Sequence, residues 1–219
     1  MATTRRPTEE RRAEIVEAAL RLIGARGIAA LTVSSLVGEL GITGGALYKH
    51  FPSTDAILEA VAARAVEALD ASTPEASLPP RAWIRALAEA RTSTVSGHAG
   101  LSRLLLSEQF VFALPAPAVT LLKGAVRKTR EGLVRAIREG QRVGEIRDDL
   151  PAEALAPIVL GTIQMIAMHR AGPLLPRVEG DPLALIDTVL ALLAPRVVEA
   201  PTTTASAPSE RRATEKRRP

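Results

Sequence analysis

The sequence predicts an all-α protein, and three observations support this fold class. Alanine and leucine are abundant, and both residues favour helix. Aromatic residues make up only 2% of the 219 residues while 47% are hydrophobic, so the core has to be built from aliphatic side chains. Apolar residues also recur at intervals of three and four, with glycine or proline between the runs. We therefore expect one or two domains that are helical throughout.

The first predicted helix runs from Glu9 to about Arg26. Gly24 and Gly27 lie at its end, where glycine commonly terminates a helix. The helix is amphipathic, so we expect it to pack across the segment that follows and to support it. Its apolar stripe consists of Ile15, Ala18, Ala19, Leu22 and Ile23.

Residues 31–51 predict two short helices joined by a tight turn. Thr32 precedes the first helix, where its hydroxyl is placed to accept from a free backbone N–H. Gly41 ends that helix, because glycine adopts the left-handed conformation at little cost. Thr43 caps the second helix in the same way, and Leu47 turns inward. This layout is typical of a helix-turn-helix, whose second helix enters the major groove of DNA. The first helix has its apolar face at Val33, Leu36, Val37 and Leu40.

The segment ends in the run Leu47-Tyr48-Lys49-His50-Phe51-Pro52, which follows Gly41-Ile42-Thr43 and the apolar helix from Glu14 to Ile23. Together these residues resemble the DNA-binding domain of TetR-family repressors. The resemblance covers roughly Thr8 to Ala68. It implies an N-terminal three-helix DNA-binding domain over residues 9–69, with the motif at 32–51, followed by a C-terminal helical domain for ligand binding and dimerisation. The rest of the chain matches the family only in length and helical pattern.

The resemblance also implies which residues contact DNA. In the family pattern Tyr48 and His50 meet backbone phosphates, and Lys49 meets a phosphate or a base edge. Many members have a lysine at the position of Thr54, which donates a hydrogen bond but no charge, so we expect weaker and less salt-dependent binding from this point. The expected DNA-contacting residues are Thr32, Ser34, Thr43, Gly44, Gly45, Ala46, Tyr48, Lys49, His50 and Thr54.

The front of the second helix, Gly44-Gly45-Ala46, offers few side-chain donors. Each glycine costs a helix about 1 kcal/mol relative to alanine. One interpretation is that the glycines let the backbone approach the floor of the groove. The other is that glycine is merely tolerated at position 44, where family members often have a longer side chain. Base discrimination should then rely on Thr43, Lys49 and the shape of the DNA.

Helical patterns continue to residue 194. Ser53 or Thr54 can cap the helix after Pro52. The small and proline-rich residues 71–80 predict a domain boundary, and we assign residues 80–194 to a helical effector-binding and dimerisation domain. Within it, a long helix after Pro117 is expected to bury one stripe. That stripe consists of Leu122, Val126, Leu133 and Ile137.

The last predicted helix, which Asp181 caps and Pro182 enters in its first turn, is apolar on most sides. Such a helix has to be buried on more than one face. It is therefore either central in the monomer or packed against a neighbouring subunit. The resemblance implies the second arrangement, a homodimer in which the last two helices form a four-helix bundle.

The resemblance and the large apolar second domain favour control by a small, lipophilic effector. It would enter between the helices of residues 80–170 and favour a conformation in which the two recognition helices are wrongly spaced for DNA. Gln164 or His169 would be its polar anchor. Met and Phe at helical spacing are also ordinary core residues. The pocket candidates are Trp83, Phe110, Phe112, Gln164, Met165, Met168 and His169.

The leading hypothesis is a homodimeric repressor that an effector releases from an inverted-repeat operator in double-stranded DNA. The alternative is a constitutive DNA-binding dimer, or an activator, with no small-molecule effector. An enzyme has little support, because the three histidines are scattered without metal-ligand spacing and neither a nucleophile elbow nor a phosphate-binding glycine loop is present.

Composition narrows the function classes further. The absence of cysteine excludes disulfides and thiol chemistry. The net charge of +4 suits a nucleic-acid partner, but it also suits an ordinary basic soluble protein. No apolar stretch reaches the ~18 residues of a membrane span. We expect a cytoplasmic protein with no cofactor, no metal and no membrane partner.

Both ends of the chain are basic. Residues 1–8 carry Arg5 and Arg6, which either touch phosphates or the minor groove, or belong to a solvated arm. Residues 195–219 are predicted to be a disordered basic tail, which either adds non-specific attraction to DNA or is passive.

Overall fold

The computed structural model describes residues 8–106, 112–171, 181 and 183–195. Every regular element in these ranges is helical, which confirms the predicted fold class. The arm with Arg5 and Arg6, the residues Phe110 and Pro182, and the tail beyond residue 195 lie outside the described residues. The elements are α1 (Thr8–Arg26), η1 (Ile28–Ala30), α2 (Val33–Leu40), α3 (Gly44–Tyr48), α4 (Thr54–Ala71), α5 (Pro80–Ser96), α6 (Ala99–Leu106), α8 (Ala116–Arg142), α9 (Ala152–Ala171) and α10 (Ala184–Leu192).

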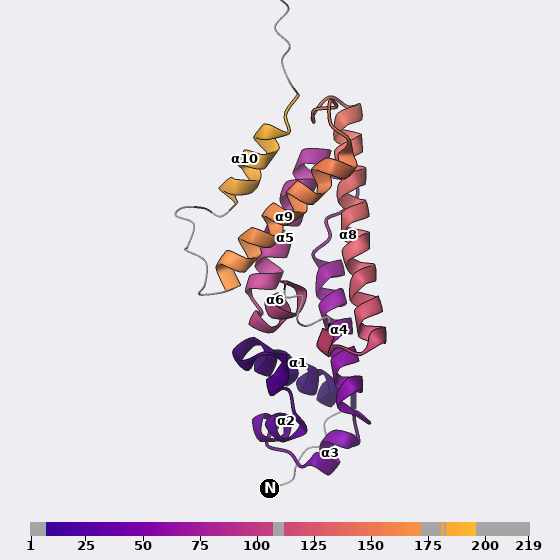
Figure 1. Ribbon diagram of the computed structural model, residues 1–219, viewed down its shortest axis with the longest axis vertical. Helices are drawn as coiled ribbons and strands as arrows, with labels where there is room; N and C mark the ends of the chain where they lie inside the picture. The colour runs from indigo at the N-terminus through magenta and orange to yellow at the C-terminus, as the bar shows by residue number, and fades with distance from the viewer. Residues whose placement is uncertain (1–7, 107–111, 172–180, 182, 196–219) are drawn as a thin grey trace, which may run out of the picture.

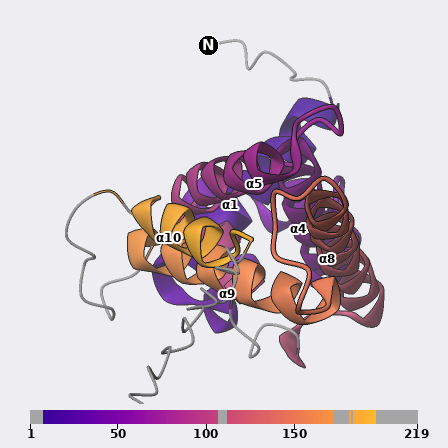
Figure 2. The ribbon, with the colours of Figure 1, turned by 90° about the horizontal axis from the view of Figure 1, so that it is seen from above.

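The molecule is elongated, with the short helices at one end (Figure 1). Helices α1, α2 and α3 form the lower end in that view, and α4 leads from them toward the other helices. Seen along the long axis, α5, α8 and α9 lie on three sides of the upper part, and α10 lies between α5 and α9 and contacts both (Figure 2). The N-terminal and C-terminal helical groups are thus stacked along one axis.

Two apolar cores hold these helices together, and α6 links them. The first core lies among α1 to α4, but it also includes Leu101 and Leu104 of α6 and Leu122 of α8. The second core lies among α5, α8, α9 and α10. The division into domains at residues 71–80 stays a prediction, because α6 and the start of α8 complete the core of the N-terminal helices.

Helix α6 lies unusually close to α1, because two glycines occur where they meet. A β-carbon built on Gly100 would lie 2.1 Å from the carbonyl oxygen of Leu20. One built on Gly24 would lie 2.7 Å from the backbone nitrogen of Gly100. Both distances are far below van der Waals contact, so only glycine permits this crossing.

Two details differ from the sequence prediction. Val126 is 47% exposed rather than buried, because its side of α8 faces a cleft toward α4 and α9 instead of a packed helix. Helix α10 begins at Ala184, two residues later than predicted, although Asp181 Oδ1 still accepts from the backbone N–H of Leu183 at 3.0 Å. The other three residues of the predicted α8 stripe are buried, as expected.

Candidate nucleic-acid interface and effector cavity

Local capping fixes the helix-turn-helix in the way the sequence predicts. Thr32 Oγ1 accepts from the backbone N–H of Ser35 at 3.1 Å, and Ser35 Oγ accepts from that of Thr32 at 3.0 Å. Gly41 ends α2 with φ of 63°. Thr43 Oγ1 then accepts from Ala46 N at 3.2 Å and starts α3. These side chains satisfy backbone groups that two such short helices would otherwise leave free.

Helix α3 is anchored by one buried side chain and presents its other residues outward. Leu47 and Phe51 are buried in the first core. Tyr48 is half-exposed and Lys49 is exposed. Ser53, rather than Thr54, caps α4, since its Oγ accepts from Ala56 N at 3.1 Å. The structure therefore gathers the ten predicted DNA-contacting residues at one end of the molecule, on α2, α3, the start of α4 and the residues beside them (Figure 1).

Arg12 of α1 holds the residues that follow α3 in place. The sequence did not lead us to predict this role for Arg12. Its Nη1 donates to the carbonyl oxygen of His50. Its guanidinium carbon also lies 4.2 Å from the centroid of the Phe51 ring, a cation–π contact. The sequence contains an indication of this contact, because Arg12 lies three residues before Ile15 on the apolar stripe of α1. A charge on a buried stripe indicates a specific partner.

Replacing Thr43 by alanine should weaken both the fold and DNA binding. α3 has five residues, so it depends on its cap, and losing an N-cap hydroxyl costs about 1 kcal/mol. We expect that loss in urea denaturation, together with weaker operator binding by fluorescence anisotropy. Thr43→Ser keeps the cap and should retain stability; equal destabilisation by both substitutions would contradict the capping role.

A cavity lies among the upper helices. Its volume is about 70 Å³, it is partly open to solvent, and it is lined mainly by apolar side chains of α4, α5, α6, α8 and α9. The residues that line it include Leu69 of α4, Leu105 of α6 and Ile163 of α9.

Of the seven predicted pocket residues, Gln164 lines this cavity. Trp83 instead lines an open groove beside the 73–80 loop, where its Nε1 donates to Pro74 O at 3.3 Å. Phe112 is 89% exposed. Met165 and Met168 lie on the outer face of α9, because the helical period that turns Ile163 inward turns them outward. Phe110 and the side chain of His169 lie outside the described residues.

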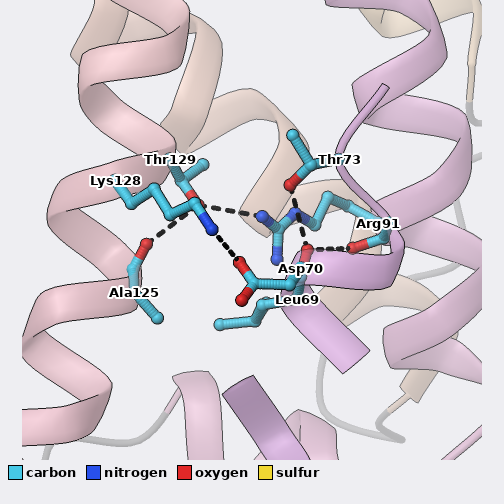
Figure 3. A network of polar contacts seen from close by, with 8 residues as sticks. Leu69, Asp70, Thr73, Arg91, Ala125, Lys128 and Thr129 are labelled. Carbon is cyan, nitrogen blue, oxygen red and sulfur yellow. Dashed lines mark hydrogen bonds and ion pairs between the residues drawn. The ribbon is translucent and has the colours of Figure 1, made fainter. Parts of the chain in front are cut away.

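Arg91 supplies a charge at this cavity, and the sequence analysis missed it too. Its position continues the buried stripe of Ile84, Leu87 and Ala88, so here again a charge on an apolar stripe was the available signal. Its Nη2 donates to Thr129 Oγ1 at 2.8 Å (Figure 3). Burial lowers the pKa of the Arg91 guanidinium to about 10, against the opposing attraction of Asp70. The group therefore stays charged at neutral pH.

The described residues lack the features of two other kinds of site. No three acidic or histidine side chains there come close enough together to hold a metal ion. Within the same ranges, no helix has both the length and the apolar character needed to cross a bilayer.

Comparison with known proteins agrees with this geometry. Residues 15–61 match the family model described as bacterial regulatory proteins of the tetR family. A 49-residue stretch is 39% identical to the uncharacterized HTH-type transcriptional regulator YerO of Bacillus subtilis (strain 168). That stretch is 22% of this chain and 17% of the relative, so the sequence match is confined to a small part of both.

The likeness to solved structures is much more extensive. The complex of AibR with isovaleryl coenzyme A and operator DNA matches with a TM-score of 0.69 at 19% identity, over 84% of this chain and 97% of that one. FadR from Bacillus subtilis, in complex with stearoyl-CoA, matches with a TM-score of 0.61 at 19% identity, over 83% and 97%. At such identities the likeness establishes the fold. The family match lies over the helix-turn-helix, so residues 15–61 are similar to the DNA-binding part of tetR-family regulators, while the solved structures share the fold of most of the chain.

Proposed function

We propose that the protein is a homodimeric repressor that leaves an inverted-repeat operator when a small, lipophilic effector enters the cavity. One observation carries the effector part of this proposal. The cavity is lined by Leu69 of α4 and Leu105 of α6, and both helices also contribute to the core of the DNA-binding helices. A ligand that favours another position of α4 or α6 would thereby favour another position of α3.

The outer face of α9 supports the dimer. Five small or apolar residues follow one another along it at helical spacing, and all five are exposed in the monomer. Exposed apolar stripes of this kind are typical of helix–helix interfaces. Leu192 of the adjacent α10 is exposed as well. The stripe on α9 consists of Ala154, Ile158, Gly161, Met165 and Met168.

The neighbouring structures support an operator and an effector. AibR is described with both operator DNA and isovaleryl coenzyme A, and FadR with stearoyl-CoA. In a two-fold dimer of this chain, the two α3 helices would face DNA about 34–36 Å apart or a multiple of that spacing. The preferred duplex should therefore be an inverted repeat.

Selection of bound sequences from random duplexes, followed by fluorescence anisotropy, tests the DNA-binding part. An inverted repeat should emerge. Tyr48→Ala should weaken its binding by about 10- to 100-fold, because a symmetric dimer loses the same hydrogen bond of about 1 kcal/mol twice. Tyr48→Phe, which loses only the hydroxyl, is the matched control for ring contacts. Equal binding by wild type and Tyr48→Ala would refute this placement of α3.

The effector part is tested by release of the same duplex. Compounds that raise the melting temperature of the protein should also lower its affinity for the operator. If every compound that binds leaves operator affinity unchanged, the constitutive DNA-binding dimer is the correct description.

A further inference from the structure

The cavity combines an apolar wall with a buried charge that has no counter-ion in the described residues. Its wall is formed largely by aliphatic side chains, among them Leu69, Leu87, Leu160 and Ile163. Arg91 lines the same cavity and is only 6% exposed. An arginine in such surroundings is costly unless it is paired, so its presence calls for a partner.

The hydrogen bonds of Arg91 leave much of its guanidinium unused. Nη2 donates to Thr129 Oγ1, which itself donates to Ala125 O at 3.1 Å (Figure 3). Nε and Nη1 are both buried and, within the described part of the chain, have no hydrogen-bond partner. Thr129 therefore orients the guanidinium but leaves two of its nitrogens with unused donors.

Asp70, the acidic side chain that attracts Arg91, is already paired with a lysine. Asp70 attracts Arg91, but its Oδ1 accepts from Lys128 Nζ at 2.7 Å (Figure 3). Among the residues that the structure describes, no carboxylate forms an ion pair with Arg91. Within the described ranges, the charge on Arg91 is thus open to a bound group.

We propose that the cavity binds a carboxylate carried on an apolar chain, with the carboxylate against Arg91 and the chain along the leucines. A carboxylate accepts two N–H groups of a guanidinium at once, which makes it the matching partner for the unused donors. A thioester or an amide has no charge and would leave the arginine buried and unpaired. This inference rests on the proposed function, since it names the chemical class of the effector.

The test measures binding to the full-length protein without DNA, by isothermal titration calorimetry. The probes are octanoate, octanamide, octyl phosphate and octanoyl coenzyme A, which share one chain and differ in the head group. Octanoate should bind at least tenfold more tightly than octanamide, because hydrogen bonds to charged groups are about twice as strong as neutral ones. Equal binding by octanamide, tighter binding by octyl phosphate or octanoyl coenzyme A, or no binding at all would overturn the assignment.

Variants assign the preference to Arg91. Arg91→Gln should bind octanoate and octanamide equally, whereas Arg91→Lys should keep a reduced preference for octanoate because it keeps the charge. Arg127→Gln, which removes the same charge from an exposed position on α8, should behave as wild type. A preference for octanoate that survives in Arg91→Gln would overturn the inference. If Arg91→Gln fails to fold, the Arg91→Lys variant decides between the outcomes. A preference of Arg91→Lys for octanoate over octanamide as strong as that of the wild type would overturn the role of the guanidinium geometry.

Operator release separates this inference from the proposed function. If octanoate binds through Arg91 but leaves the protein on DNA, the carboxylate site stands and the repressor mechanism fails. If octanamide releases the operator equally from wild type and Arg91→Gln, the repressor mechanism stands and the carboxylate site fails.

Discussion

Gly100→Ala should lower the free energy of unfolding by about 2–3 kcal/mol, a typical cost of adding a methyl group to a closely packed contact. The new β-carbon would lie 2.1 Å from the carbonyl oxygen of Leu20. That atom belongs to the backbone of α1, so relief requires α1 and α6 to move apart as whole helices. For a chain of this size the melting temperature should fall by about 4–12 °C.

The matched control for Gly100→Ala is Gly124→Ala in α8. A β-carbon at Gly124 meets nothing within 4 Å, so that substitution should stabilise the helix by about 0.5–1 kcal/mol. Calorimetry on both variants gives the comparison. A similar melting temperature for the two would show that α1 and α6 do not press together as closely as the structure indicates.

Ile158→Glu should convert the proposed dimer to a monomer. The side chain is 57% exposed in one subunit, so glutamate fits the isolated fold. In the proposed interface it would bury an unpaired charge, which costs about 3 kcal/mol or more, and this raises the dissociation constant of the dimer about 100-fold or more. Losing simultaneous contact with two half-sites should then weaken operator binding by about 10²- to 10⁴-fold.

Analytical ultracentrifugation and fluorescence anisotropy test these two effects together. Leu121→Glu is the control, because Leu121 is also an exposed apolar residue but lies on α8, across the helical body from α10 (Figure 2). It should remain dimeric with unchanged operator affinity. A dimeric Ile158→Glu protein would place the interface elsewhere.

The sequence predicts well those features that depend on neighbours along the chain. The caps at Thr32 and Thr43 and the left-handed turn at Gly41 follow from residues within four positions of each other, and the structure confirms all three. The same holds for the buried position of Leu47, because a short amphipathic helix has one obvious inner face.

The cavity could not be predicted in this way. Helical periodicity identifies a face, but it does not say whether another helix, a cleft or a second subunit lies against that face. Val126 faces a cleft and Met165 faces outward for this reason, although both fit an apolar stripe. Arg12 and Arg91 were visible in the pattern as charges on apolar stripes, yet their partners come from positions 38 residues away or more.

The chain contains a single tryptophan, and its place in the fold makes it an optical reporter. Trp83 lies against Gly132 of α8, whose added β-carbon would be 3.1 Å from the indole ring. Leu87 and Arg91 follow one and two turns further along α5 and line the cavity. A compound that spreads α5 from α8 would admit water to the indole and red-shift its emission, so occupancy can be followed by intrinsic fluorescence without any label.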